Sequence, residues 1–375
     1  MTNKIRLFLC VAAALGLISC GPKSSDIVIG EYGTLTGNDA TFGISSRNGI
    51  EMAMDEVNKA GGVLGKKIKV IVEDDRGDPG EATTVVKKLI SSDQVIALLG
   101  EVASTRSKAG ANVAQENKIP MISPSSTNPA VTQIGDYIFR VCFIDPFQGL
   151  VMAKFATNTL KVKNVAILRD VKNDYSVGLA DVFLEEFKKM GGNIVSDQSY
   201  SAGDVDFSAQ LTTIKAKNPQ AIFVPGYYTE VGLIARQMKK LGMTAIMMGG
   251  DGWDSPKLTE IGGEAMDGAY FSNHYSVDDP SPAIQKFVGD YKARFNQVPD
   301  ALAALAYDAA HILVEAMKRA NSTEGPKLRD AIAQTADYAG VTGKITIDKD
   351  RNSVKPAVVL QVKDRKLKFI ETITP

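Results

Sequence analysis

The sequence is short of the residues that most often do chemistry. It has three cysteines, two histidines and one tryptophan in 375 residues. Cys10 and Cys20 belong to the N-terminal segment, and a lone Cys142 cannot form a disulfide within the rest of the chain. His274 and His311 give a histidine-based catalytic site few members, and the Gly-x-Ser-x-Gly nucleophile motif is absent. These absences argue against an enzyme.

Long apolar runs are also missing. The run Leu7–Leu17 is far too short to span a membrane, and with Lys4 and Arg6 before it the segment is typical of a secretory signal. Leu17-Ile18-Ser19-Cys20 resembles the lipobox of bacterial lipoproteins. That resemblance implies that residues 1–19 are a signal peptide, that Cys20 is acylated to hold the protein to a membrane, and that residues 20–25 form a tether.

No charge of one sign dominates. Loss of residues 1–19 removes two of the 43 basic residues and none of the 43 acidic ones, which leaves a formal charge of −2. This balance excludes an electrostatic footprint for nucleic acid. With 44% hydrophobic residues the chain can bury a large core, and its length favours two domains over one.

Two segments only partly match cofactor or metal motifs. Residues 60–67 look like a phosphate-binding loop, but they follow a helical pattern and precede a strand, which is the reverse of the required order. Residues 348–352 begin like a calcium loop, but Ser353 replaces the glycine of the turn and Val359 replaces the bidentate Glu. The sequence therefore predicts no metal and no cofactor.

Strand and helix patterns alternate along the chain. Ile27–Gly30 and Ile68–Val72 read as strands, and the helix between them carries Ile50, Ala53 and Val57 on one face. The alternation restarts at Val165–Leu168, after Cys142. The pattern predicts two α/β domains with parallel sheets, and three helices after residue 282 supply the missing helical layer of the first domain.

Polar residues follow two neighbouring strands of the first domain, Val95–Leu99 and Ile119–Ile122. They are Ser104, Ser125, Ser126 and Thr127. Ligands of open parallel sheets bind beyond the carboxyl ends of the strands, where helix N-termini favour anions. These hydroxyls therefore predict a site for a ligand with a carboxylate; the alternative is that they are helix caps and turn residues.

Strand ends of the second domain carry aromatic and acidic residues. Tyr175, Tyr227, Asp251 and Trp253 are the candidates. A carboxylate opposite hydroxyls, with aromatic walls, suits a zwitterion with an apolar side chain. The alternative is that each Tyr is a half-buried surface residue and that Asp251 forms a turn among glycines.

Several segments, in order along the whole mature chain, resemble the leucine/isoleucine/valine-binding proteins of bacterial ABC importers. They are Gly33–Gly37, Ala60–Gly65, Glu73–Pro79, Ile122–Thr127, Asp170–Gly178, Asp204–Phe207 and Gly226–Val231. The resemblance implies the type I periplasmic-binding fold, in which two Rossmann-like lobes are joined by a hinge of three crossovers and close on a ligand. The implied lobes are residues 26–142 with 274–350, and residues 143–273 with 351–375.

The resemblance also implies roles for the candidates. Ser104 and Thr127 would bind the ligand carboxylate, Ser125 would offer its carbonyl to the ammonium, and Ser126 would line the pocket. Asp251 would face the ammonium. Tyr175 and Tyr227 would come from the second lobe, and Phe42 would lie against the ligand side chain. Asp251 and Trp253 differ from the residues of the best-known members, and no cysteine pair stands at residues 76–77 and 102–103, where some relatives carry a disulfide.

Three hypotheses follow. The first is a monomeric, non-enzymatic, lipid-anchored solute-binding protein outside the cytoplasm, which delivers an aliphatic, branched-chain or otherwise apolar L-amino acid to an ABC permease. The second is a lobe that senses an amino acid or amide and reports to a membrane signalling partner. The third is an enzyme on a nucleotide-binding α/β fold, which lacks the glycine-rich dinucleotide loop here.

Overall fold

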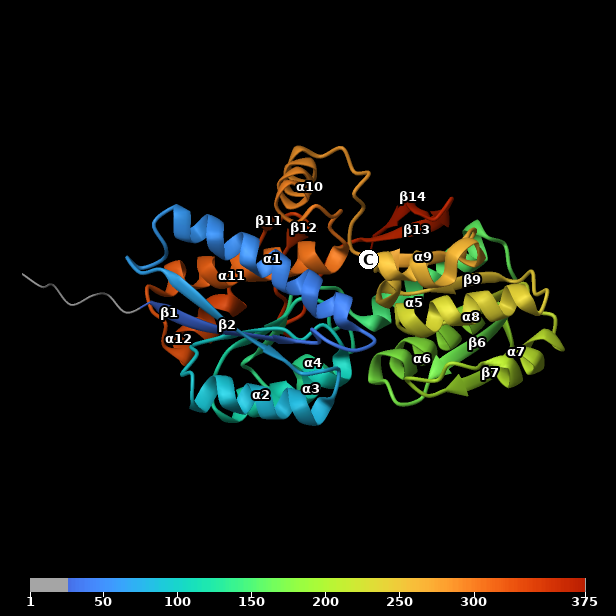
Figure 1. Cartoon of the computed structure of the whole chain (residues 1–375), viewed down its shortest axis with the longest axis horizontal. Helices are drawn as coiled ribbons and strands as arrows, with labels where there is room; N and C mark the ends of the chain where they lie inside the picture. The colour runs from blue at the N-terminus through green and yellow to red at the C-terminus, as the bar shows by residue number, and fades with distance from the viewer. Residues whose placement is uncertain (1–25, 375) are drawn as a thin grey trace, which may run out of the picture.

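Two α/β lobes lie side by side in the computed structural model, which describes residues 26–374 (Figure 1). The segments assigned to the signal peptide, the tether and the lipidated Cys20 lie outside the described residues. No helix in residues 26–374 is long and apolar enough to cross a membrane. We call the part built on the first sheet the N-terminal lobe and the part built on the second sheet the C-terminal lobe.

The N-terminal lobe has a five-stranded parallel sheet in the order β2-β1-β3-β4-β5. Its strands are β1 (Ile27–Gly33), β2 (Ile68–Asp74), β3 (Leu98–Leu99), β4 (Met121–Ser123) and β5 (Ile138–Arg140). The strand predicted from Val95 is shorter than expected, because regular pairing begins only at Leu98, although Ile96 N still donates to Val28 O over 2.9 Å.

Helices cover both faces of this sheet. They are α1 (Ala40–Lys59), α2 (Pro79–Ser91), α3 (Ser104–Glu116), α4 (Ala130–Gln133), α10 (Pro282–Phe295), α11 (Ala301–Ala320) and α12 (Gly325–Ala333). One core cluster joins α1 to α11 and α12, and the other joins α2 to α3 on the opposite face. Two of the three late helices, α11 and α12, therefore complete the helical layer of the first domain as the sequence predicted, and in Figure 1 α11 lies directly beside α1. The third, α10, packs in a separate cluster with α1 and α11.

The C-terminal lobe has a seven-stranded sheet in the order β14-β13-β10-β9-β8-β6-β7. Its strands are β6 (Asn164–Asp170), β7 (Asn193–Tyr200), β8 (Ala221–Phe223), β9 (Ile246–Gly249), β10 (Tyr270–Asn273), β13 (Ala357–Lys363) and β14 (Lys366–Ile373). The first five are parallel, and β13 and β14 add an antiparallel edge. The doubly wound α/β class predicted from the sequence is confirmed.

Helices again lie on both faces of the second sheet. They are α5 (Asp145–Lys154), α6 (Asp174–Lys189), α7 (Ser208–Lys215), α8 (Tyr228–Lys240) and α9 (Pro256–Gly262), with the π-helical segment η1 (Phe155–Thr159) and the 3₁₀-helices η2 (Asp251–Trp253) and η3 (Gly263–Met266). A small hairpin, β11 (Tyr338–Gly340) with β12 (Gly343–Ile345), packs against the N-terminal lobe through Ile345.

The chain passes between the two sheets three times. It leaves β5 for α5, leaves β10 for α10, and leaves β12 for β13. A hinge of three crossovers therefore joins the lobes. The residue boundaries predicted for the lobes remain a prediction.

Candidate functional site

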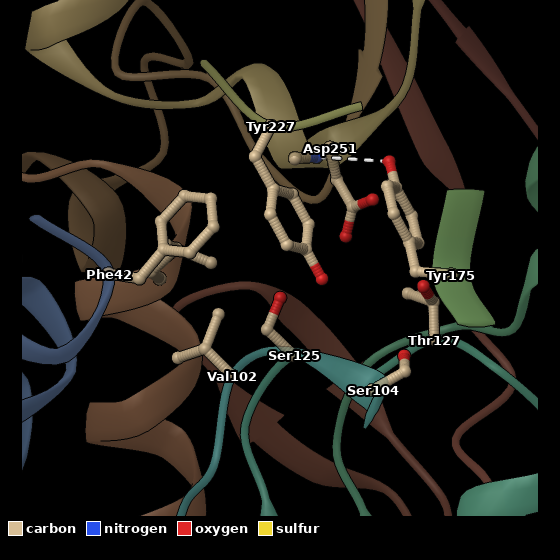
Figure 2. Close-up of a pocket in the computed structure, with 10 residues that line it drawn as sticks. Phe42, Val102, Ser104, Ser125, Thr127, Tyr175, Tyr227 and Asp251 are labelled. Atoms are coloured by element: carbon tan, nitrogen blue, oxygen red, sulfur yellow. Dashed lines mark hydrogen bonds between the residues drawn. The ribbon is translucent and has the colours of Figure 1, made fainter. Parts of the chain in front are cut away.

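A cavity lies between the lobes. Its lining residues are Phe42, Val102, Ser104, Ser125, Thr127 and Leu302 from the N-terminal lobe and Tyr175, Tyr227, Asp251 and Gly252 from the C-terminal lobe. Figure 2 shows Phe42 and Val102 at one end and Ser104, Thr127 and Tyr175 at the other, with the Asp251 carboxylate pointing between them. The cavity thus has an apolar end and a polar end.

The loop between β3 and α3 and the loop between β4 and α4 build the polar end, and the Ser126 side chain joins them. Its hydroxyl lies 2.6 Å from Ser107 Oγ, 3.1 Å from Glu101 O and 2.9 Å from Val102 O. Ser123 adds a bond of 2.7 Å to Glu101 O. Since Ser126 is fully occupied in joining the loops, we assign it a structural role rather than a place in the pocket.

Arg140 fixes the loop between β4 and α4. Its guanidinium is fully buried and donates to Ser126 O, and to Asn128 O over 2.8 Å. A buried cation that satisfies carbonyls on both sides of Thr127 holds this backbone in one conformation. The neighbouring Ser125 and Thr127 are thereby held at the cavity.

The N-terminus of α3 provides the groups for an anion. Ser104 is the first residue of this helix, and the first N–H groups of a helix have no partner within it. Ser104 Oγ accepts from Asn128 N over 3.2 Å, and Thr127 Oγ1 is buried without a well-aligned hydrogen bond among the described residues. Hydroxyls and a helix N-terminus together suit a carboxylate.

The glycine-rich turn after β9 places Asp251 opposite these groups. A Cβ at Gly250 would lie 2.5 Å from Tyr175 Oη and 2.7 Å from Gln148 Oε1, so only glycine fits there. Gln148 Oε1 accepts from Asp251 N over 2.8 Å, and Tyr175 Oη accepts from Gly252 N over 3.2 Å, the bond dashed in Figure 2. The backbone of the turn is therefore held on both sides of Asp251.

The Asp251 carboxylate is buried and half satisfied. Oδ2 accepts from His274 Nε2 over 3.0 Å, whereas Oδ1 has no hydrogen-bond partner among the described residues. The pKa of the neighbouring Asp145 is raised to about 8, mainly by burial and also by the charge of Asp251, although the Thr127 hydroxyl and Arg140 lower it. Asp145 is not among the residues that line the cavity, so Asp251 supplies the cavity's carboxyl group. A buried carboxylate oxygen without a partner is unfavourable, and a cationic group of a ligand would stabilise it.

Aromatic and aliphatic side chains form the apolar end. The Phe42 ring stands edge-on to Tyr227, with 5.1 Å between centroids, and Tyr227 stacks on Tyr175 at 5.5 Å. Val102 and Leu302 complete this end. These residues can enclose a branched apolar side chain.

Seven of the nine predicted site residues line the cavity, and Ser126 and Trp253 do not. Trp253 is fully buried beneath the turn, where its ring covers Gly249 and its Nε1–H donates to Val224 O over 2.9 Å. It therefore supports the turn instead of forming a wall. The sequence missed three lining residues, Val102, Gly252 and Leu302.

Direct contacts hold the lobes together around the cavity. Asp174 N donates to Thr105 Oγ1 over 3.0 Å, and Tyr228 Oη donates to Asn38 O over 2.7 Å. Phe42 and Leu302 share one apolar cluster with residues of the C-terminal lobe. The structure is therefore a closed form of the two lobes.

This architecture defines a class. Two α/β lobes joined by three crossovers and closed over a small polar and apolar cavity characterise the two-lobed solute-binding proteins. The family model described as periplasmic binding protein matches residues 26–366, and the chain belongs to that family. The family consists of binding proteins, not enzymes. Membership of this family implies a location outside the cytoplasm.

Individual relatives agree with this assignment. The chain is 33% identical to Leu/Ile/Val-binding protein homolog 3 of Brucella melitensis, over 86% of this chain and 87% of the relative. A leucine-binding protein from Thermotoga maritima has a TM-score of 0.90 at 41% identity, over 93% of this chain and 99% of that chain. A branched-chain amino acid transporter substrate-binding protein from Streptococcus pneumoniae, in complex with isoleucine, has a TM-score of 0.89 at 34% identity, over 94% of this chain and 100% of that chain.

Proposed function

We propose that this protein captures an aliphatic L-amino acid between its lobes and delivers it to an ABC importer. The observation that carries the proposal is that Asp251, whose Oδ1 has no partner among the described residues, lines the same cavity as Ser104 and Thr127. Asp251 takes the ammonium, and Ser104 and Thr127 take the carboxylate. The side chain lies between Phe42, Val102, Leu302 and Tyr227.

The chemistry of the cavity limits the ligand. Its polar end suits the charged groups of an amino acid and its apolar end suits an aliphatic side chain, whereas a sugar would place hydroxyls against the apolar end. A carboxylic acid without an amine would leave Asp251 buried and unpaired, which costs affinity. The names of the Thermotoga and Streptococcus relatives support branched-chain amino acids as the ligand class.

Attachment and delivery complete the proposal. Acylation of Cys20 holds the protein at a membrane, and the closed lobes present the bound amino acid to permease subunits there. The proposed binding unit is the monomer, since one chain supplies both walls of the cavity.

Calorimetric titration of the purified protein tests the ligand class. L-Leucine, L-isoleucine and L-valine should bind, and L-leucine should bind far more tightly than D-leucine, 4-methylpentanoate or 3-methylbutylamine. Each of the last two lacks one of the two charged groups. Equal affinity for L-leucine and 4-methylpentanoate would refute the role of Asp251, and binding of a sugar or polyamine alone would refute the ligand class.

A further inference from the structure

His274 is the side chain that holds the proposed ammonium partner, and it lies outside the cavity lining. Its Nε2 is 3.0 Å from Asp251 Oδ2, and its side chain is fully buried. Because a carboxylate has no hydrogen to donate, Nε2 carries the hydrogen and donates a hydrogen bond to Asp251 Oδ2. This bond occupies Oδ2 and leaves Oδ1 as the carboxylate oxygen without a partner among the described residues.

His274 belongs to the hinge. It follows β10 directly, in the crossover that leads to α10, and its ring stacks on Phe143 in the crossover from β5 to α5, with 3.8 Å between centroids and 23° between planes. Gln148 fixes the backbone of Asp251 from α5 and also accepts from Ser272 Oγ over 2.8 Å. His274 of one crossover thus holds the carboxylate of Asp251, and Gln148 of α5 holds its backbone.

The charge state of His274 matters for the ligand. The pKa of the imidazole is lowered, mainly by burial. Lys355 in the third crossover also lowers this pKa, whereas the nearby Asp251 carboxylate raises it. Asp251 and Lys355 are the charged groups that act on this ring among the described residues. A neutral imidazole donates one hydrogen bond and leaves the full negative charge of Asp251 for a ligand, whereas an imidazolium would compete with the ammonium.

We propose that His274 is a positioning residue, which holds Asp251 so that a single carboxylate oxygen faces the ligand and thereby selects amino acids over carboxylic acids without an amine. This inference rests on the proposed function, since it acts on the same ammonium. It adds a residue that contacts no ligand atom and links ligand recognition to the hinge.

Two variants separate the hydrogen bond from packing. His274→Leu keeps an apolar side chain of similar size against Phe143 and removes the donor. His274→Gln keeps an N–H donor at about the reach of Nε2. With L-leucine as the probe, His274→Leu should weaken binding roughly 10- to 100-fold, as expected for a lost hydrogen bond to a charged group, and His274→Gln should stay within about threefold of the parent protein.

The amine preference is the readout that a merely structural role would not move. The affinity for 4-methylpentanoate should change less than about threefold in His274→Leu, so the preference for L-leucine over 4-methylpentanoate should fall by about the same factor as the leucine affinity. In an Asp251→Ala background, His274→Leu should have little further effect, because the two residues act as one unit. Thermal melts without ligand check that every variant folds.

The outcomes distinguish the two proposals. Unchanged leucine binding in Asp251→Ala would refute the proposed function. Weak binding in Asp251→Ala with unchanged binding in His274→Leu would refute only the role of His274. The role of His274 would also be refuted if His274→Leu lost affinity equally for L-leucine and 4-methylpentanoate, or if the effects were additive in the double variant. Both results describe a residue that merely supports the fold.

Discussion

Replacement of Asp251 by Asn tests the charge of the site with the smallest change of shape. Asp251 is 4% exposed, and closure of the lobes removes both it and a ligand ammonium from water. In Asp251→Asn the single amide oxygen can still accept a hydrogen bond from His274. The other end of the amide is then an NH₂ group, so the ligand ammonium finds no acceptor there. The variant thus keeps the local structure and loses the ammonium partner.

The size of the effect follows from the uncompensated charge. Removing one member of a buried, hydrogen-bonded charge pair costs about 2–5 kcal/mol, much of it from the partner left unpaired. Each 1.4 kcal/mol is a factor of ten, so the affinity for L-leucine should fall roughly 30- to 4,000-fold. Without ligand, the Asn side chain keeps the bond to His274, so the melting temperature should change little.

Calorimetry and thermal melts of the two proteins measure these effects separately. Asp364→Asn is the matched control, because Asp364 is exposed in the β13–β14 turn at φ 51°, a conformation that Asn tolerates well. The control should bind and melt like the parent protein. Equal leucine affinity in Asp251→Asn and the parent would refute the reasoning, and a much lower melting temperature without ligand would make Asp251 a structural residue.

Three further predictions concern size, pH and anchoring. Val102→Ala enlarges the apolar end and should raise the affinity for L-methionine or L-phenylalanine relative to L-valine by roughly 10-fold, measured by calorimetry; an unchanged ratio would contradict the placement of Val102. Asp145 keeps its proton to about pH 8 when folded but loses it near pH 4 when unfolded, so its contribution to stability is lost as pH rises through that window. Thermal melts at pH 5 and pH 8 should therefore show a smaller loss of stability in Asp145→Asn than in the parent, and an equal loss in both would be inconsistent with a protonated Asp145. Cys20→Ala should abolish lipidation and membrane retention in fractionated cells without changing ligand affinity, and membrane retention of the processed variant would exclude the lipobox interpretation.

Local patterns in the sequence carried much of the fold and part of the site. The alternation of strands and helices predicted both sheets, because buried parallel strands and amphipathic helices have distinct periods. The loops after β4 and β9 stood out because hydroxyls or glycines follow apolar strands, and strand ends are where such folds bind ligands. Ser125 and Asp251 are therefore recognisable from their neighbours along the chain.

The remaining features depend on contacts between distant segments. Leu302 reaches the cavity only because α11 packs on α1, and nothing around Leu302 signals this. Trp253 looked like a wall because it follows Asp251 by two residues, but its ring turns toward Gly249, where the missing side chain makes room. His274 was visible only as one of two histidines, since its bond to Asp251 spans 23 residues.

Identification of the small molecule that copurifies with the protein tests the central claim most directly. The protein would be purified without added ligand, denatured, and the released compounds identified by mass spectrometry. We predict an aliphatic L-amino acid in near-stoichiometric amount from the parent protein and a much smaller amount from Asp251→Asn. A sugar, a polyamine or an amine-free aromatic acid as the only specifically retained compound would contradict the account.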